Sequence, residues 1–211
     1  LPQVQTTRIF NLAQAIIGSR LILWGIFKKV VVADNSAYFA NEIFNNYEVY
    51  SGSAMFLGVL FFTIQIYGDF SGYSDIALGT AKLFGFDLLI NFRFPYFSRD
   101  LGEFWKRWHI SLSSWFRDYL YIPLGGSREG KFKAVRNTFI IFLVSGFWHG
   151  ASWNFIVWGF IHACAFLPLL IFNRNRVHIN SIVATERKIP NLREFLQMVT
   201  TFVVVTIAWV F

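Results

Sequence analysis

The chain is short of charge and of cysteine. Only 15% of its 211 residues are charged, while 55% are hydrophobic. A soluble globular domain usually carries about 25% charged residues, so this composition argues against a water-soluble protein and favours a membrane protein. The single cysteine, Cys164, lies inside an apolar run, which excludes an internal disulfide and leaves the redox compartment open.

Acidic residues are the scarcer charge, with 12 Asp and Glu against 19 Lys and Arg. A nucleic-acid-binding protein would carry basic clusters on a polar surface. Here the basic residues separate apolar runs, as in cytoplasmic loops and in segments that contact lipid headgroups. We therefore expect contact with membrane lipids and none with nucleic acid. Basic residues are dense between positions 93 and 136, which predicts the cytoplasmic side for that stretch.

Several apolar runs predict membrane-spanning helices. The run at 54–67 is a strong candidate, 151–172 is the clearest, and another begins at 195. The run at 9–33 is interrupted by Arg20, so it is either packed inside the protein or spans the bilayer only to one side of that residue. The predicted fold class is an all-α polytopic membrane protein.

A short polar segment follows the run at 54–67. Ser71 is a candidate cap for a second helix, with Asp75 in its first turn. Asp69 and Asp75 are carboxylates at membrane depth, where an unpaired charge is costly. They either form ion pairs that fix the fold or line a polar pocket.

The stretch 104–121 predicts one helix rich in aromatic and basic residues. Trp105, His109, Leu112 and Phe116 fall on one face of this helix. Trp combined with Arg and Lys is typical of the membrane interface. We expect a helix that lies at the cytoplasmic boundary or dips into the membrane from it.

The loop 125–131 matches the pattern G-x-x-x-x-G-K, but Phe132 stands where a nucleotide-binding P-loop needs Ser or Thr, which excludes that site. Loop amides, Arg128, Lys131 and Lys133 remain candidates for contact with donor phosphates. The sequence has no Cys-x-x-Cys or His-x-x-x-His spacing, so no metal site is predicted.

His149 ends an apolar run and is flanked by Gly146 and Gly150, which permit close backbone approach. Burial disfavours a protonated imidazole, and a neutral imidazole is a competent general base. His149 is a candidate for taking the proton from an acceptor hydroxyl as that oxygen attacks a thioester carbonyl. A structural hydrogen bond is the alternative. His109 is expected to orient the acyl donor or hold a carbonyl oxygen, with an interfacial hydrogen bond as the alternative. His162 is expected to be structural.

Two long segments carry a resemblance. They are YGDFSGYSDIALGTAKLFGFDLLINFRFPYFSRDLGEFWKRWHISLSSWFRDYLYIPLGG and SGFWHGASWNFIVWG. They resemble the membrane-bound O-acyltransferases, and within them the branch of the alginate O-acetyltransferase membrane subunits. The likeness covers almost the whole chain, which would then be a single partial domain over 1–211, truncated at both ends.

The resemblance implies a ring of tilted helices around a tunnel, with interfacial or re-entrant helices, in the bacterial inner membrane. Its invariant histidine falls on His149 and its second polar position on His109. Acetyl-CoA would be the donor, used from the cytoplasm and not held as a bound cofactor. An extracytoplasmic acetyltransferase would be the partner that modifies a polysaccharide. The expected substrate-binding residues are Asp69, Tyr73, Arg117, Asp118, Trp148 and Asn154.

Two other functions stay open. The chain also resembles D-alanyl exporters, which take their group from a carrier protein for teichoic acid modification. A non-enzymatic transporter with proton-relaying histidines is the third interpretation. Transporters often show internal repeats with broken helices, and this sequence shows no repeat. An acyl-labelling assay separates enzyme from transporter.

Overall fold

The structure, a computed structural model, describes residues 2–5, 7, 9–128, 130–178, 183 and 189–210. Every regular element among them is a helix, which confirms the predicted all-α class. The chain divides into two compact units, Leu1–Asn91 and Phe92–Phe211, and each is described by itself. The prediction of one partial domain over 1–211 stays a prediction.

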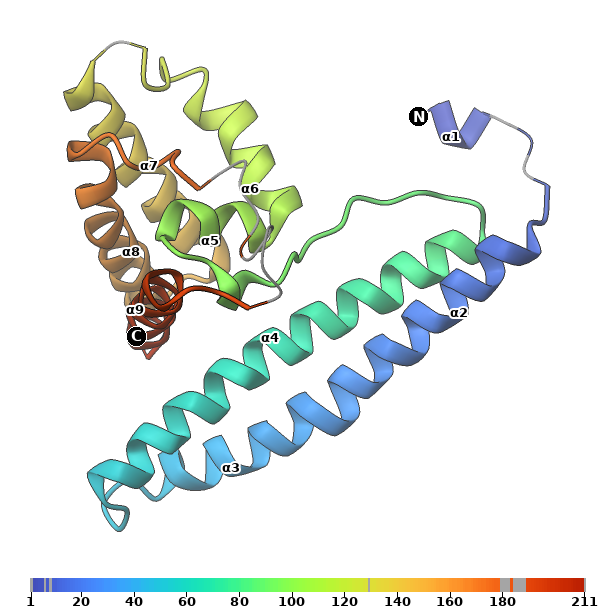
Figure 1. The fold of residues 1–211 in the computed structure, drawn as a ribbon, viewed down its shortest axis with the longest axis horizontal. Coiled ribbons are helices and arrows are strands. Elements are labelled where there is room, and N and C mark those ends of the chain that lie inside the picture. Colours follow the sequence, from blue (N-terminus) through green and yellow to red (C-terminus); the bar gives the residue numbers. More distant parts are fainter. Residues whose placement is uncertain are drawn as a thin grey trace. The chain divides into compact units, whose positions relative to one another are not determined.

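The first unit is a long helical hairpin (Figure 1). A nearly continuous rod of consecutive helices packs along a single long helix, and Asn11 and Ser51 cap the N-termini of the two arms with their side chains. The elements are α1 (Pro2–Gln5), α2 (Leu12–Ile26), the π-helix η1 (Phe27–Ala33), α3 (Asp34–Asn45) and α4 (Gly52–Leu83).

Glycines set the distance between the two arms of this hairpin. A Cβ atom on Gly18 would lie 2.7 Å from the carbonyl oxygen of Gly79, and one on Gly25 would lie 2.5 Å from that of Gly72. On each arm the two glycines are seven residues apart, about two helical turns, so both contacts fall on one seam. Any side chain at these positions would push the backbones apart.

Helix α4 runs without a break through the polar segment, so the prediction that Ser71 caps a second helix is wrong. Ser71 is buried within α4. The segment stays helical because α4 packs against the other arm of the hairpin. The two carboxylates form ion pairs with the other arm. Asp69 lies 2.6 Å from Lys29, and Asp75 lies 2.8 Å from Lys28.

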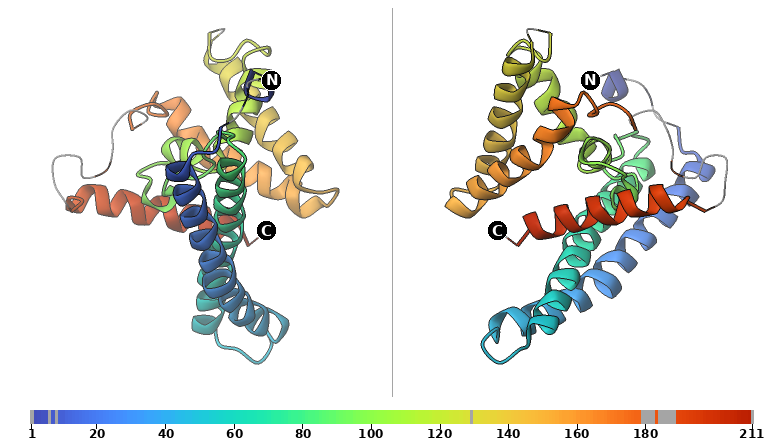
Figure 2. Two further views of the ribbon diagram at one scale, coloured as in Figure 1. Left: turned by 90° about the vertical axis from the view of Figure 1, so that its right-hand side faces the viewer. Right: turned by 60° about the vertical axis from the view of Figure 1, so that its left-hand side comes forward.

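The second unit contains a helical hairpin, α7 with α8, and a set of short helices (Figures 1 and 2). Gly146 on α7 and Gly159 on α8 allow the contact, since a Cβ on either would fall on the carbonyl oxygen of Phe155 or Phe142 on the other helix. The elements are η2 (Pro95–Phe97), α5 (Leu101–Arg107), α6 (Ile110–Phe116), the π-helix η3 (Arg117–Tyr121), α7 (Lys131–His149), α8 (Trp153–Ile171) and α9 (Leu192–Ala208).

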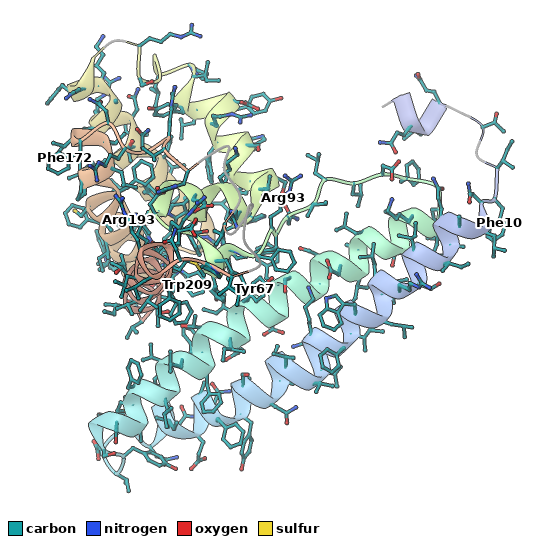
Figure 3. All side chains as sticks on the ribbon, viewed as in Figure 1. Phe10, Tyr67, Arg93, Phe172, Arg193 and Trp209 are labelled. Carbon is teal, nitrogen blue, oxygen red and sulfur yellow. The ribbon has the colours of Figure 1, made fainter. Side chains whose placement is uncertain are left out.

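The prediction of one continuous helix over 104–121 is wrong, because the chain breaks at Trp108 and His109. Trp108 is extended and buried against Phe104 and Trp209, the latter labelled in Figure 3. The amide of Arg93 also donates to the carbonyl of Arg107, at 3.0 Å. Tertiary packing of Trp108 thus overrides the helical pattern.

A buried ion network holds the short helices to α9. The Glu103 carboxylate, 2% exposed, accepts from Arg99 at 3.0 Å and pairs with Arg107. Arg99 also donates to Glu194 of α9, at 3.2 Å. Two guanidinium groups on one buried carboxylate make Glu103 the centre of the network.

Within the described residues, α4 and α8 are long and apolar enough to cross a membrane. The predicted span at 151–172 therefore corresponds to α8, and the one at 54–67 is the first part of a longer helix. Large apolar side chains such as Trp24, Phe56 and Phe160 are exposed. Figure 3 shows the side chains that project outward from these helices. Apolar outer surfaces are typical of helices that face lipid.

Candidate active site

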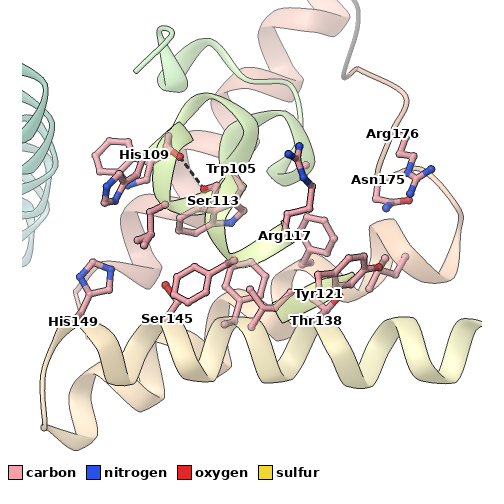
Figure 4. A pocket seen from close by; sticks show the side chains of 18 residues that line it. Trp105, His109, Ser113, Arg117, Tyr121, Thr138, Ser145, His149, Asn175 and Arg176 are labelled. Carbon is pink, nitrogen blue, oxygen red and sulfur yellow. Dashed lines mark hydrogen bonds between the residues drawn. The ribbon is translucent and has the colours of Figure 1, made fainter. Parts of the chain in front are cut away.

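A cavity of about 290 Å³ lies within the second unit. Helices α5, α6 and α7 form most of its wall, with contributions from η3, from α8 and from the segment at 175–176. Apolar side chains dominate, and a few polar groups converge on it, as in many ligand sites. The polar side chains are His109, Ser113, Arg117, Tyr121, Thr138, Ser145, His149, Asn175 and Arg176 (Figure 4).

His149 is the last residue of α7, directly before the turn into α8. Three aromatic rings pack around the imidazole of His149. Its ring centroid lies 5.0 Å from that of Trp148, 5.1 Å from that of Trp158 and 6.0 Å from that of Phe155. Its side chain lines the cavity. His149 is exposed in the described part of the chain, so the structure does not confirm the expected burial of its imidazole.

His109 lies at the junction of α5 and α6 with a left-handed backbone, φ 43° and ψ 58°. Such a conformation costs a residue other than glycine about 1–3 kcal/mol and persists only where the surroundings enforce it. Burial lowers the pKa of His109 to about 4, and the nearby His149 contributes a smaller lowering. Its imidazole is therefore neutral at pH 7.

The two histidines, 40 residues apart in sequence, line the same cavity. The ring of Trp148 is near both of them, 6.1 Å from His109 and 5.0 Å from His149. In Figure 4 both imidazoles lie at one end of the cavity, and Asn175 and Arg176 lie at the other. The arrangement agrees with the predicted shared site, while the catalytic roles stay predictions.

Two of the expected substrate-binding residues are neighbours on η3. Arg117 lines the cavity and makes a two-pronged ion pair with Asp118, at 2.7 and 3.1 Å. This pairing lowers the pKa of Asp118 and raises that of Arg117, so both groups are charged at neutral pH. Asp118 itself is not among the cavity-lining residues.

The other four expected residues do not line this cavity. Trp148 lies beside both histidines, and Asn154 is exposed in the first turn of α8. Asp69 and Tyr73 belong to the first unit, where Asp69 pairs with Lys29 and Tyr73 is 69% exposed. Substrate binding by these residues stays a prediction.

The sequence did not indicate several polar residues of the cavity, among them Ser145, Tyr121 and Arg176. Ser145 precedes His149 by one helical turn, so the spacing alone could have placed both on one face of α7. Tyr121 reaches the cavity because η3 is a π-helix, whose wider turn is not visible in the sequence pattern. Arg176 lies in a polar segment with no periodicity to indicate where it points.

A second cavity, of about 450 Å³, shares Asn175 and Arg176 with the first. Arg128 and Lys131 also line it, and Lys131 donates to the carbonyl of Ile171 at 3.3 Å. The described residues that line this second cavity include basic side chains and no carboxylate. Arg128, Lys131 and Arg176 are groups that suit an anion.

The sequence matches the family model for MBOAT, the membrane-bound O-acyltransferase family, over residues 3–207. The chain belongs to this family. The membership confirms the resemblance drawn from the two long motifs, and it makes the chain part of a membrane protein.

Curated relatives agree with this assignment. The chain is 38% identical to a peptidoglycan O-acetyltransferase of Helicobacter pylori, over all of this chain and 39% of that protein. It is 41% identical to a probable alginate O-acetylase, AlgI, of Pseudomonas aeruginosa, over 92% of this chain and 35% of that protein. It is also 38% identical to a teichoic acid D-alanyltransferase of Streptococcus thermophilus, over 59% of this chain and 31% of that protein. The chain thus spans between 31% and 39% of the length of these relatives.

Proposed function

We propose that the protein is an O-acyltransferase of the bacterial inner membrane, with several membrane-spanning helices, that moves an acetyl group from a cytoplasmic thioester toward an extracytoplasmic polysaccharide. One observation carries the proposal: a histidine at the α5–α6 junction and a histidine at the end of α7 line one cavity with apolar walls. The names of the relatives, which refer to O-acetylation of alginate and peptidoglycan, support a hydroxyl acceptor and a polysaccharide product.

The proposed reaction uses the neutral imidazole of His149 as general base. The acceptor oxygen attacks the thioester carbonyl carbon while its proton passes to His149. The carbon–sulfur bond then breaks, and His149 returns the proton to the leaving thiolate. In the proposed reaction His109, a neutral group that lines the same cavity, donates a hydrogen bond to the carbonyl oxygen, where negative charge develops.

The basic side chains that line the second cavity support a donor with phosphate groups, such as acetyl-CoA. Arg176 lines both cavities, and Arg128 and Lys131 lie in the second one. A thioester arm in the first cavity would place the donor's phosphates among these basic groups, where guanidinium and ammonium groups bind phosphate well. The apolar walls at Trp105 and Phe142 suit the arm itself.

A D-alanyl group delivered by a carrier protein is the second candidate, because the Streptococcus thermophilus relative is named for D-alanyl transfer. The two reactions share the attack on a thioester and differ in the donor. The partner would be an extracytoplasmic acetyltransferase in the first case and a carrier protein in the second.

The proposal is tested in cells that lack the native gene. They are complemented with the intact protein or its His149→Ala form, at equal abundance in the membrane, and polysaccharide O-acetylation is measured. We expect acetylation with the intact protein and its loss with the variant. Normal acetylation by the variant would overturn the role of His149. If the intact protein restores teichoic acid D-alanylation and no acetylation, the second candidate is favoured.

A further inference from the structure

His162 is the most deeply buried histidine that the proposed reaction does not use. It lies in the middle of α8 with 0% of its surface exposed. Neither ring nitrogen has a hydrogen-bond partner among the described residues. A buried polar group without a partner is costly, and a leucine would fill similar space without that cost. The imidazole must therefore have a use that an apolar side chain lacks.

Three aromatic rings surround this imidazole. The ring centroids of Trp105 and Trp158 lie 4.9 and 4.6 Å from that of His162, both edge-on, and Phe142 stacks at 6.1 Å. Trp105 and Phe142 line the first cavity, whereas His162 lies behind them. His162 thus supports the cavity wall from its outer side.

Trp105 carries a second unpaired group at the same place. Its indole Nε1 is buried and has no hydrogen-bond partner among the described residues. An indole N–H is a donor only, whereas a neutral imidazole offers one acceptor nitrogen. The two groups are chemically complementary, and their ring centroids lie 4.9 Å apart.

Trp158 connects His162 to the proposed base. Its ring packs edge-on against His162 at 4.6 Å and against His149 at 5.1 Å. His162 therefore touches the cavity wall through Trp105 and the surroundings of His149 through Trp158. A shift of His162 would move both.

We propose that His162 is a positioning residue for acyl transfer: it accepts a hydrogen bond from the Trp105 indole, which sets the cavity wall, and it holds Trp158 against His149. This inference rests on the proposed function, because it assigns His162 a role in that reaction. His162 touches neither donor nor acceptor. Its effect is on the alignment of the reacting groups, so it acts on kcat more than on donor KM.

The test uses the intact protein in detergent or vesicles, with acetyl-CoA as the probe, and measures kcat, KM and Tm. His162→Leu removes both nitrogens at similar volume, and His162→Gln keeps a hydrogen-bonding side chain. We expect His162→Leu to lower kcat by about ten- to a hundredfold without lowering Tm. His162→Gln should retain most of the rate. Trp105→Phe should cause a similar loss, and the double variant with His162→Leu should lose no more than either alone.

Three results would overturn the inference. They are a wild-type kcat in His162→Leu, an equal loss of Tm and activity in both His162 variants, and independent losses in the double variant. His149→Ala serves as the control for the proposed function. If the wild type and His149→Ala transfer equally well, the proposed function fails, whereas wild-type activity in His162→Leu beside an inactive His149→Ala defeats only the role of His162.

Discussion

The two units of this chain use their polar residues in different ways. In the first unit, ion pairs such as Lys29–Asp69 join the long helix α4 to a rod of consecutive helices, and the backbones of the two arms meet at glycines. In the second unit, helices are short and interrupted, and His109 has a left-handed backbone at a cavity. The first unit has a regular helical structure without the candidate catalytic residues. The irregular second unit contains His109 and His149, which line the cavity.

The difference shows where packing overrides local preference. The break at Trp108 is maintained by an aromatic cluster and by the buried carboxylate of Glu103. Irregular backbone within a membrane protein is tolerated where it is covered by protein or lines a cavity. The interrupted helices of the second unit meet both conditions.

Glu103→Gln should have the largest effect on stability. It leaves the guanidinium groups of Arg99 and Arg107 without their shared carboxylate, and loss of one partner from a buried ion pair costs about 3–5 kcal/mol. The measurement is the free energy of unfolding of the intact protein in detergent. Asp69→Asn is the matched change in the first unit, where the ion pair is far more exposed and Lys29 keeps Asp34 as a partner. A loss at Asp69 as large as that at Glu103 would contradict the contrast between the units.

Gly79→Val should have an intermediate effect, through the seam of the first unit. Its side chain would fall on the backbone of Gly18, and overpacking costs about 1–3 kcal/mol. Gly52→Ala is the control, since among the described residues no atom outside its chain neighbours and its own helix backbone lies within 4 Å of the added Cβ. It should be neutral or stabilise by about 0.4–1 kcal/mol. Thermal unfolding of both variants checks this. Equal midpoints for Gly79→Val and the wild type would mean that the glycine seam does not set the packing.

His109→Gln should have the smallest effect of these substitutions: it should leave the pH dependence of acyl transfer unchanged. The pKa of His109 is lowered to about 4, so its imidazole gains a proton only as the pH falls toward that value. Between about pH 5.5 and 8 it stays neutral, as glutamine does. The rate of acyl transfer will be lower in the variant, yet the midpoint of its acid limb should match the wild type. A midpoint that moves or disappears would show that His109 titrates in this range.

Much of the fold was predictable from the sequence. Apolar runs at 54–67 and 151–172 predicted α4 and α8, the two helices among the described residues that are long and apolar enough to cross a membrane. The glycines beside His149 predicted a close approach, which Gly146 makes against Phe155. The periodicity of 104–121 also identified residues that do line the cavity, among them Trp105, His109 and Phe116, although the helix itself is broken.

The remainder depends on contacts between distant parts of the chain. Trp209 packs on Trp108 from 101 positions away, and no local pattern reveals such a partner. The continuity of α4 through Ser71 likewise follows from the other arm of the hairpin rather than from its own polar sequence. Arg176 reaches the cavity from an irregular segment, where sequence gives no direction for a side chain.

The most direct test of the central claim measures acetyl transfer from acetyl-CoA by the purified intact protein and its His149→Ala form, with folding checked by Tm. General-base catalysis contributes about 10²–10⁴-fold. We predict a loss of kcat of that size at unchanged Tm. Equal rates for the two proteins would contradict the claim that the cavity shared by His109 and His149 is the site of acyl transfer.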